Sequence, residues 1–141
     1  MALTVRDLMT PDPYTVGPQE TVSEVVALMD AHQIRHVPVV DAEGEIVGLV
    51  SHRDVLRGAL AGIDQLPMSQ QQDLLTTIPV REVMIPDVET ADPSQELVEI
   101  AEMILENKFG CVPVVENQSL VGILTESDFV RHVIESLDTV A

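Results

Sequence analysis

The second half of this chain repeats the first, and that repeat limits the possible folds more than any other feature. A shift of 75 residues, with one residue dropped in the turn after Asp41, aligns the two halves over roughly fifty positions. Such order predicts two copies of one structural unit, so a site carried by one copy is expected twice. The matching segments are Val5–Met9 with Val80–Met84, Val37–Val40 with Val112–Val115, and Gly48–Asp54 with Gly122–Asp128.

The 141-residue length fits two small subdomains, each marginally stable if left alone. We expect a first repeat over residues 1–79, with a core at 5–62, and a second over 80–141, with a core at 80–134. An apolar share of 45% predicts a folded chain, and the scarcity of aromatic residues predicts an aliphatic core.

Each repeat is predicted to be an α+β unit of order β-α-β-β-α. A turn-like helix at Val5–Met9 or Val80–Met84 precedes an extended piece near Thr15 or Thr90. In the first copy, Thr21 and Glu24 have capping-box spacing before an apolar helical stripe. The stripe residues are Val22, Val25, Val26 and Met29, and in the second copy Leu97, Ile100, Ala101 and Ile104.

In the second copy, Asp92 and Pro93 are a suitable N-cap and first helical residue. Two strands rich in Val and Ile follow each helix, and a last helix begins near Ser51 or Thr125. Gly58–Pro79 is longer than a turn. It contains the polar Met68–Gln72 stretch, while Leu74, Leu75 and Ile78 predict that it packs in part against the fold. We expect an extension of the preceding helix, a mobile or partner-contacting loop, and a short return segment.

The formal charge of −17 argues against nucleic-acid binding, which needs clustered Lys and Arg. Neither a signal peptide nor a membrane span is expected, because no cationic start precedes an apolar run and no apolar run is long enough. The single cysteine, Cys111, cannot form an internal disulfide, which fits a reducing compartment, and we expect the cytoplasm.

The pattern Gly-x-x-Ser/Thr-x-x-Asp occurs at Gly48, Ser51 and Asp54, and again at Gly122, Thr125 and Asp128. It has two interpretations. The hydroxyl and the carboxylate can cap a helix. Alternatively, because the pattern recurs behind a glycine that permits close approach, the carboxylate can accept both hydroxyls of a ribose.

Three motifs recur in the same order in both halves, from about Val5 to His132: a Val-Pro-Val-Val segment, a Val-Gly-Leu-Val or Val-Gly-Ile-Leu segment, and the pair Ser51–Asp54 or Thr125–Asp128. In these motifs and their order, the chain resembles a stand-alone tandem cystathionine-β-synthase (CBS) domain pair. The resemblance implies two repeats packed by pseudo-twofold symmetry, with two clefts that bind AMP, ADP, ATP or S-adenosylmethionine. It implies ribose contacts from Ser51, Asp54, Thr125 and Asp128. Further ligand contacts would come from the Val-Pro-Val-Val strand of the opposite repeat. In one cleft, Ser51 and Asp54 would thus face the segment Gly110, Cys111, Val112 and Pro113. In the other, Thr125 and Asp128 would face the segment Arg35, His36, Val37 and Pro38.

Four basic side chains distinguish the first copy: Arg35, His36, His52 and Arg53, which we call the basic quartet. Their counterparts are Gly110, Cys111, Glu126 and Ser127. Because guanidinium and imidazolium groups bind phosphate, we expect the Thr125–Asp128 cleft, with Arg35 and His36, to favour a phosphorylated ligand, while Arg53 could serve either cleft. The alternative is that Arg35 and Arg53 form surface salt bridges.

Two other features have structural alternatives. His32, His36 and His52 lack the spacing of a metal site, and Cys111 precedes an apolar strand and fits a packing role better than a redox role.

The sequence therefore predicts a regulatory module for energy sensing that binds an adenosine nucleotide and needs no obligatory cofactor, with Mg²⁺ accompanying the ligand if it is ATP. The repeats occupy the chain and no catalytic constellation is evident, so we expect no enzymatic activity and an action in trans on an unidentified protein effector. The resemblance also implies a homodimer. The alternative function is a structural dimerisation module with empty clefts.

Overall fold

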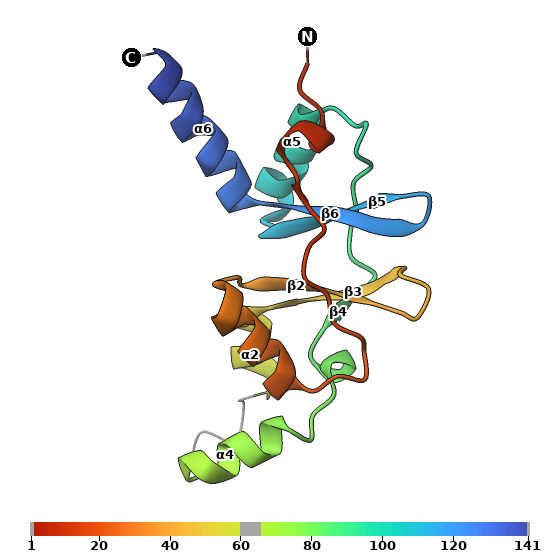
Figure 1. Cartoon of the computed structure of the whole chain (residues 1–141), viewed down its shortest axis with the longest axis vertical. Helices are drawn as coiled ribbons and strands as arrows, with labels where there is room; N and C mark the ends of the chain where they lie inside the picture. The colour runs from red at the N-terminus through yellow and green to blue at the C-terminus, as the bar shows by residue number, and fades with distance from the viewer. Residues whose placement is uncertain (1, 60–65, 141) are drawn as a thin grey trace. The chain divides into compact units, whose positions relative to one another are not determined.

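The computed structural model describes residues 2–59 and 66–140 and divides the chain into two compact units (Figure 1). We name them after their motif residues. The Ser51 unit is Tyr14–Val88, and the Thr125 unit is Met1–Pro13 with Glu89–Ala141. The units therefore cut across the sequence repeats, because the opening segment of each repeat belongs to the unit formed by the other.

The Ser51 unit contains a three-stranded antiparallel sheet of order β2-β3-β4. Helix α2 packs on β2, and Val16 and Val39 form a parallel bridge, which is the predicted extended piece. The elements are α2 (Val22–His32), β2 (His36–Val40), β3 (Ile46–Ser51), α3 (His52–Asp54), a π-helix (Val55–Ala59), α4 (Met68–Leu75), a 3₁₀ turn (Val80–Glu82) and β4 (Ile85–Pro86).

The Thr125 unit repeats this plan with a sheet of order β1-β6-β5. Ala91 and Val114 form the equivalent parallel bridge. The elements are α1 (Val5–Leu8), β1 (Thr10–Pro11), α5 (Leu97–Asn107), β5 (Cys111–Glu116), β6 (Ser119–Thr125) and α6 (Glu126–Val140).

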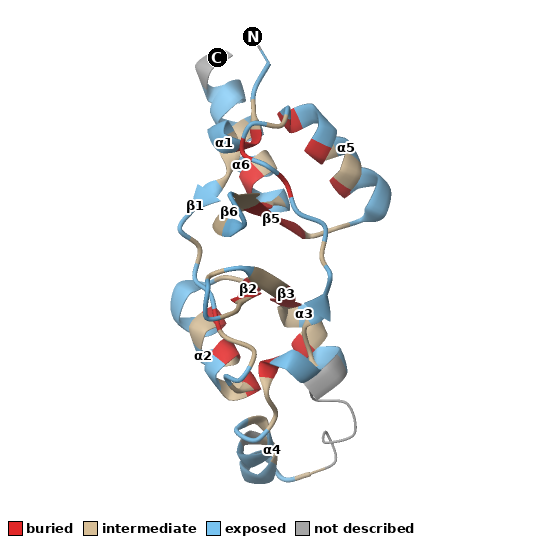
Figure 2. Ribbon diagram, turned by 90° about the vertical axis from the view of Figure 1, so that its right-hand side faces the viewer, coloured by how far each residue is buried: buried red, intermediate tan, exposed pale blue. Residues whose placement is uncertain are grey.

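Each unit has its own core, and both cores are aliphatic, as the scarcity of aromatic residues predicts. Val22, Val25 and Met29 of α2 pack against Val37 and Val39 of β2 in one core. Leu97, Ile100 and Ile104 of α5 pack against Val112 and Val114 of β5 in the other. Figure 2 shows these buried positions in red along one side of each helix. The predicted helical stripes are therefore confirmed.

The opening segments are exchanged between the repeats. Val5 is fully buried in the core of the Thr125 unit, and Val80 is fully buried in the core of the Ser51 unit. Thr10 of β1 pairs with Ile123 of β6, while Ile85 of β4 pairs with Leu49 of β3. Each sheet is therefore completed by a strand from the other repeat.

The prediction that Asp92 and Pro93 begin a helix was wrong, because α5 begins at Leu97. Asp92 instead organises the preceding turn, where its carboxylate accepts hydrogen bonds from the hydroxyl and the backbone N–H of Ser94, which lower its pKa. The backbone carbonyl oxygen of Leu3 accepts a hydrogen bond from the N–H of Leu97 at 2.8 Å. The start of α5 is thus satisfied by a distant segment rather than by a local cap.

The polar Met68–Gln72 stretch lies in helix α4, a separate helix that was not predicted within Gly58–Pro79. Leu75 and Ile78 pack against the core of the Ser51 unit as expected, whereas Leu74 is exposed. The predicted mobile loop falls largely on residues 60–65, which lie outside the described residues. Within the described ranges, no helix has the length and apolar character needed to cross a bilayer.

Candidate ligand sites at the strand-to-helix turns

The two repeated motifs lie where the last strand of each hairpin passes into a helix. Ser51 ends β3 and precedes α3, and Thr125 ends β6 and precedes α6. Both form capping boxes. Ser51 Oγ accepts from the N–H of Asp54 at 3.1 Å, and Thr125 Oγ1 accepts from the N–H of Asp128 at 3.3 Å. The two carboxylates accept in return from the N–H groups of Ser51 (3.0 Å) and Thr125 (2.8 Å).

The capping interpretation of the motif is therefore correct, and it does not exclude ligand binding. A serine or threonine hydroxyl that accepts a bond can still donate one, and a carboxylate has about four acceptor positions. The capping box fixes the hydroxyl and the carboxylate side by side on the first helical turn, next to backbone N–H groups that favour negative charge.

The glycine before each motif has a structural role in these units. A Cβ atom built on Gly48 would lie 2.5 Å from Met84 Sδ and 3.1 Å from the carbonyl oxygen of Ile85. One built on Gly122 would lie 2.8 Å from Met9 Sδ and 3.0 Å from the carbonyl oxygen of Thr10. The close approach that glycine permits here is that of the exchanged strand.

The carboxylates of Asp54 and Asp128 differ in their surroundings. Asp128 is 4% exposed, and its Oδ1 accepts from Thr10 Oγ1 at 2.9 Å and from Arg131 Nη1 at 3.1 Å. Asp54 is partly exposed, and among the described residues its carboxylate accepts only from Ser51. The repeat pattern did not reveal Thr10, which lies 118 residues from Asp128. The only available signal for Arg131 was its position three residues after Asp128, where an arginine can reach back along a helix.

The structure brings the basic quartet together with Ser51 at one end of the β2–β3 hairpin. His36 pairs with Ser51 across the two strands. The N–H of His52 donates to the carbonyl oxygen of Arg35 at 2.8 Å. Arg53 is exposed on α3. All four side chains therefore belong to the Ser51 unit.

The salt bridges that were the alternative role for Arg35 and Arg53 do not occur among the described residues, where the ion pairs are Arg6–Glu116 and Arg131–Asp128. The implied combination of Arg35 and His36 with Thr125 and Asp128 joins residues of different units, and it stays a prediction. So does the combination of Ser51 and Asp54 with Cys111, Val112 and Pro113.

The Val-Pro-Val segments are interior parts of both sheets. Val37, Pro38, Val112 and Pro113 are buried. The carbonyl oxygens of Pro38 and Pro113 accept from the N–H groups of Val16 (3.1 Å) and Ala91 (2.9 Å). The side chains of Val37 and Val112 belong to the two cores, so a ligand contact from either valine would come from its backbone.

Cys111 is 5% exposed at the start of β5, opposite Thr125. Burial, and secondarily the negative charge of Asp128, raise the pKa of its thiol to about 12. The thiol therefore stays protonated near neutral pH, and a protonated buried thiol is a poor nucleophile. The packing role predicted for Cys111 fits this environment.

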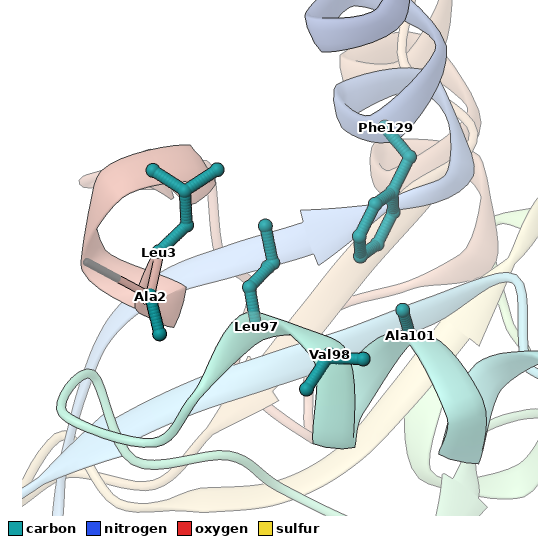
Figure 3. A pocket seen from close by; sticks show the side chains of 6 residues that line it. All are labelled: Ala2, Leu3, Leu97, Val98, Ala101 and Phe129. Carbon is teal, nitrogen blue, oxygen red and sulfur yellow. The ribbon is translucent and has the colours of Figure 1, made fainter.

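Within residues 2–59 and 66–140, no three His, Cys, Asp or Glu side chains lie close enough together to hold a metal ion. An open hollow of about 430 Å³ lies in the Thr125 unit among the N-terminal segment, α5 and α6 (Figure 3). Its lining side chains are apolar and offer no polar group to orient a ligand: Ala2, Leu3, Leu97, Val98, Ala101 and Phe129.

Comparison with known proteins agrees with this architecture. Over almost its whole length, the chain is similar to a crystal structure of a putative acetoin utilization protein (AcuB) from Vibrio cholerae. The two are 38% identical with a TM-score of 0.83, over 98% of this chain and 95% of that one. CBSX2, a CBS-pair protein from Arabidopsis thaliana, was solved in complex with AMP. It is 31% identical with a TM-score of 0.77, and the match covers 94% of this chain and 97% of that one.

The CBS domain pair of protein MJ0100 was solved with 5′-methylthioadenosine and S-adenosyl-L-methionine. It is 25% identical with a TM-score of 0.81, over 96% of this chain and 99% of that one. The CBS domain family matches the present chain twice, over residues 5–61 and 80–135. The chain therefore belongs to the CBS domain family, as a tandem pair of CBS repeats.

Proposed function

We propose that this protein is a regulatory module that senses an adenosine nucleotide (AMP, ADP or ATP) or S-adenosylmethionine. The observation that carries this proposal is the recurrence of one hydroxyl–carboxylate arrangement, Ser51 with Asp54 and Thr125 with Asp128, at the same turn of both units. The adenosine ligands held by two similar CBS pairs support the choice of ligand.

In this proposal the carboxylates accept the ribose hydroxyls, as acidic residues do in dinucleotide-binding folds. The basic quartet supplies donors for phosphate, and Mg²⁺ would accompany the ligand if it is ATP. Binding would shift the population of conformations that an unidentified protein effector recognises, so the protein would act in trans as an energy sensor. We place this activity in the cytoplasm, and we propose binding and regulation rather than catalysis.

We also propose that the protein is a homodimer. Helix α6 exposes four apolar side chains, between 53% and 65% accessible, at the i, i+3, i+4 and i+7 spacing of a single helical face. They are Val130, Val133, Ile134 and Leu137, which we call the α6 row. A second copy fits this row because an uncharged stripe on a chain of charge −17 allows two such chains to meet without opposing carboxylates.

The alternative function is a structural dimerisation module whose sites stay empty. It is favoured by the capping boxes, which satisfy the hydroxyls and carboxylates in part without any ligand.

A thermal-shift screen with AMP, ADP, ATP, S-adenosylmethionine and guanine nucleotides separates the two functions. At a ligand concentration of about 100 times Kd, binding raises the free energy of unfolding of a sensor by about 2.7 kcal/mol, which corresponds to several degrees in Tm. Asp54→Ala should reduce this shift. Asp41→Ala is the matched control, because Asp41 also accepts backbone N–H bonds, but in the turn at the other end of the same hairpin. The absence of a shift with every compound would favour the structural alternative.

A further inference from the structure

We propose that Thr10 makes the two sites unequal in affinity. Its hydroxyl donates a hydrogen bond to the Asp128 carboxylate, so that an adenosine nucleotide binds first at the site of Asp54. This inference rests on the proposed function and names the order in which its two sites fill, which is the reverse of the preference for the Thr125–Asp128 cleft expected from the sequence. The two carboxylates differ in the number of hydrogen bonds that they already accept within the protein.

An ionised carboxylate offers about four acceptor positions. Asp128 fills all of them. Its Oδ2 accepts from the N–H of Thr125 at 2.8 Å and from the hydroxyl of Thr125 at 3.2 Å. Its Oδ1 accepts from Thr10 and Arg131. A ribose diol needs two of these positions, so it must displace donors that are already in place.

Asp54 has the opposite status. Among the described residues only the N–H of Ser51 donates to it, and that bond ends on Oδ2. Its Oδ1 and one position on Oδ2 therefore remain available for two ribose hydroxyls. At Asp128 one hydroxyl would merely replace another, with no gain in hydrogen bonds, whereas at Asp54 both bonds would be gained.

The difference arises from one position on the exchanged strands. Thr10 of β1 is paired with Ile123 of β6, which holds its hydroxyl beside Asp128. The corresponding residue in the Ser51 unit is Ile85 of β4, paired with Leu49 of β3. Isoleucine has no hydroxyl to donate, so the carboxylate of Asp54 has no equivalent of Thr10.

The second donor also differs. Arg131 reaches Asp128 from the next turn of the regular helix α6. Arg57 stands three residues after Asp54 but lies in the π-helix Val55–Ala59, where the wider turn changes the direction of successive side chains. Arg57 is exposed, and no ion pair joins it to Asp54 among the described residues.

The test is a calorimetric titration of the full chain with AMP. The wild type should show a stronger and a weaker site, and Asp54→Ala should remove the stronger one. Adding Thr10→Val to Asp54→Ala frees one acceptor position on Asp128, so the remaining site should bind AMP about threefold to tenfold more tightly, as expected for one hydrogen bond. Thr10→Ser in the same background keeps the hydroxyl and should leave the affinity unchanged.

The reciprocal variant places a hydroxyl in the other unit. Ile85→Thr in the wild-type background should weaken the stronger site by a similar factor. Thr10 and Ile85 are both exposed strand residues, and the replacements suit a strand, so thermal unfolding should confirm that the variants fold.

Unchanged or weaker binding on Thr10→Val would overturn the inference, as would survival of the stronger site in Asp54→Ala. A wild type that binds none of AMP, ADP, ATP and S-adenosylmethionine would instead overturn the proposed function itself. The two failures are therefore distinct.

Discussion

At the scale of single residues, equal sequence motifs have unequal surroundings. Ser51–Asp54 and Thr125–Asp128 have the same spacing and both form capping boxes, as the sequence allowed. The partners of Asp128 could not be predicted in the same way. Thr10 reaches it through a pairing of distant strands, and no local pattern encodes such a pairing.

This inequality predicts different costs of removing the two carboxylates. Asp54→Ala loses a helix cap, which costs about 1 kcal/mol in the free energy of unfolding. Asp128→Ala loses a cap and also the hydrogen bonds from Thr10 and Arg131, whose side chains can turn to water, so we expect a cost of about 2 kcal/mol. Urea denaturation of the two variants, analysed as two-state unfolding, measures both costs.

Equal destabilisation by the two substitutions would contradict this assignment. Asp54→Ala is therefore the more specific variant for binding experiments, because a loss of binding in Asp128→Ala could follow from loss of structure.

At the scale of helices and strands, the periodic patterns predicted the elements well and the helix starts less well. The apolar stripes of α2 and α5 are buried where the sequence placed them. The start of α5 was missed because its first N–H is satisfied by Leu3, which a reading of local caps cannot detect. Helix α4 was likewise missed, because the polar stretch Met68–Gln72 has no apolar stripe that would predict a helix.

The α6 row leads to a prediction about assembly. The double variant Val133→Glu/Ile134→Glu places two charges in the row and should convert the dimer to a monomer, since burying unpaired carboxylates is costly. Light scattering coupled to size exclusion measures the mass directly. Met68→Glu is the matched control, because Met68 is 69% exposed on α4 and should leave the dimer intact. A monomeric wild type would refute the homodimer.

At the scale of the whole molecule, the repeat predicted two structural units but neither their separate cores nor the exchange of their opening segments. Two copies of one unit carry equivalent opening strands, so either strand matches either sheet by sequence alone. The chain is therefore divided in two different ways. The sequence repeats meet between residues 79 and 80, whereas one compact unit is Tyr14–Val88 and the other is the rest of the chain.

This difference gives a prediction about fragments. Residues 14–88 contain the whole Ser51 unit, including Val80 and β4, and should unfold cooperatively. Residues 1–79 form a complete sequence repeat up to its boundary but lack Val80 and β4, so they should show weak or no cooperative unfolding. Circular dichroism during urea titration compares the two fragments. Comparable stability of both would show that the exchanged segments contribute little.

The pairing of Thr10 with Ile123 also constrains how the protein folds as it leaves the ribosome. At about 5–20 residues per second, the ribosome needs on the order of 10 s to synthesise the chain between these two positions. During that time the Ser51 unit can already be complete, while β1 has no partner. The first strand to be made is therefore among the last to be paired, and its two-residue length keeps the unpaired edge small in the nascent chain.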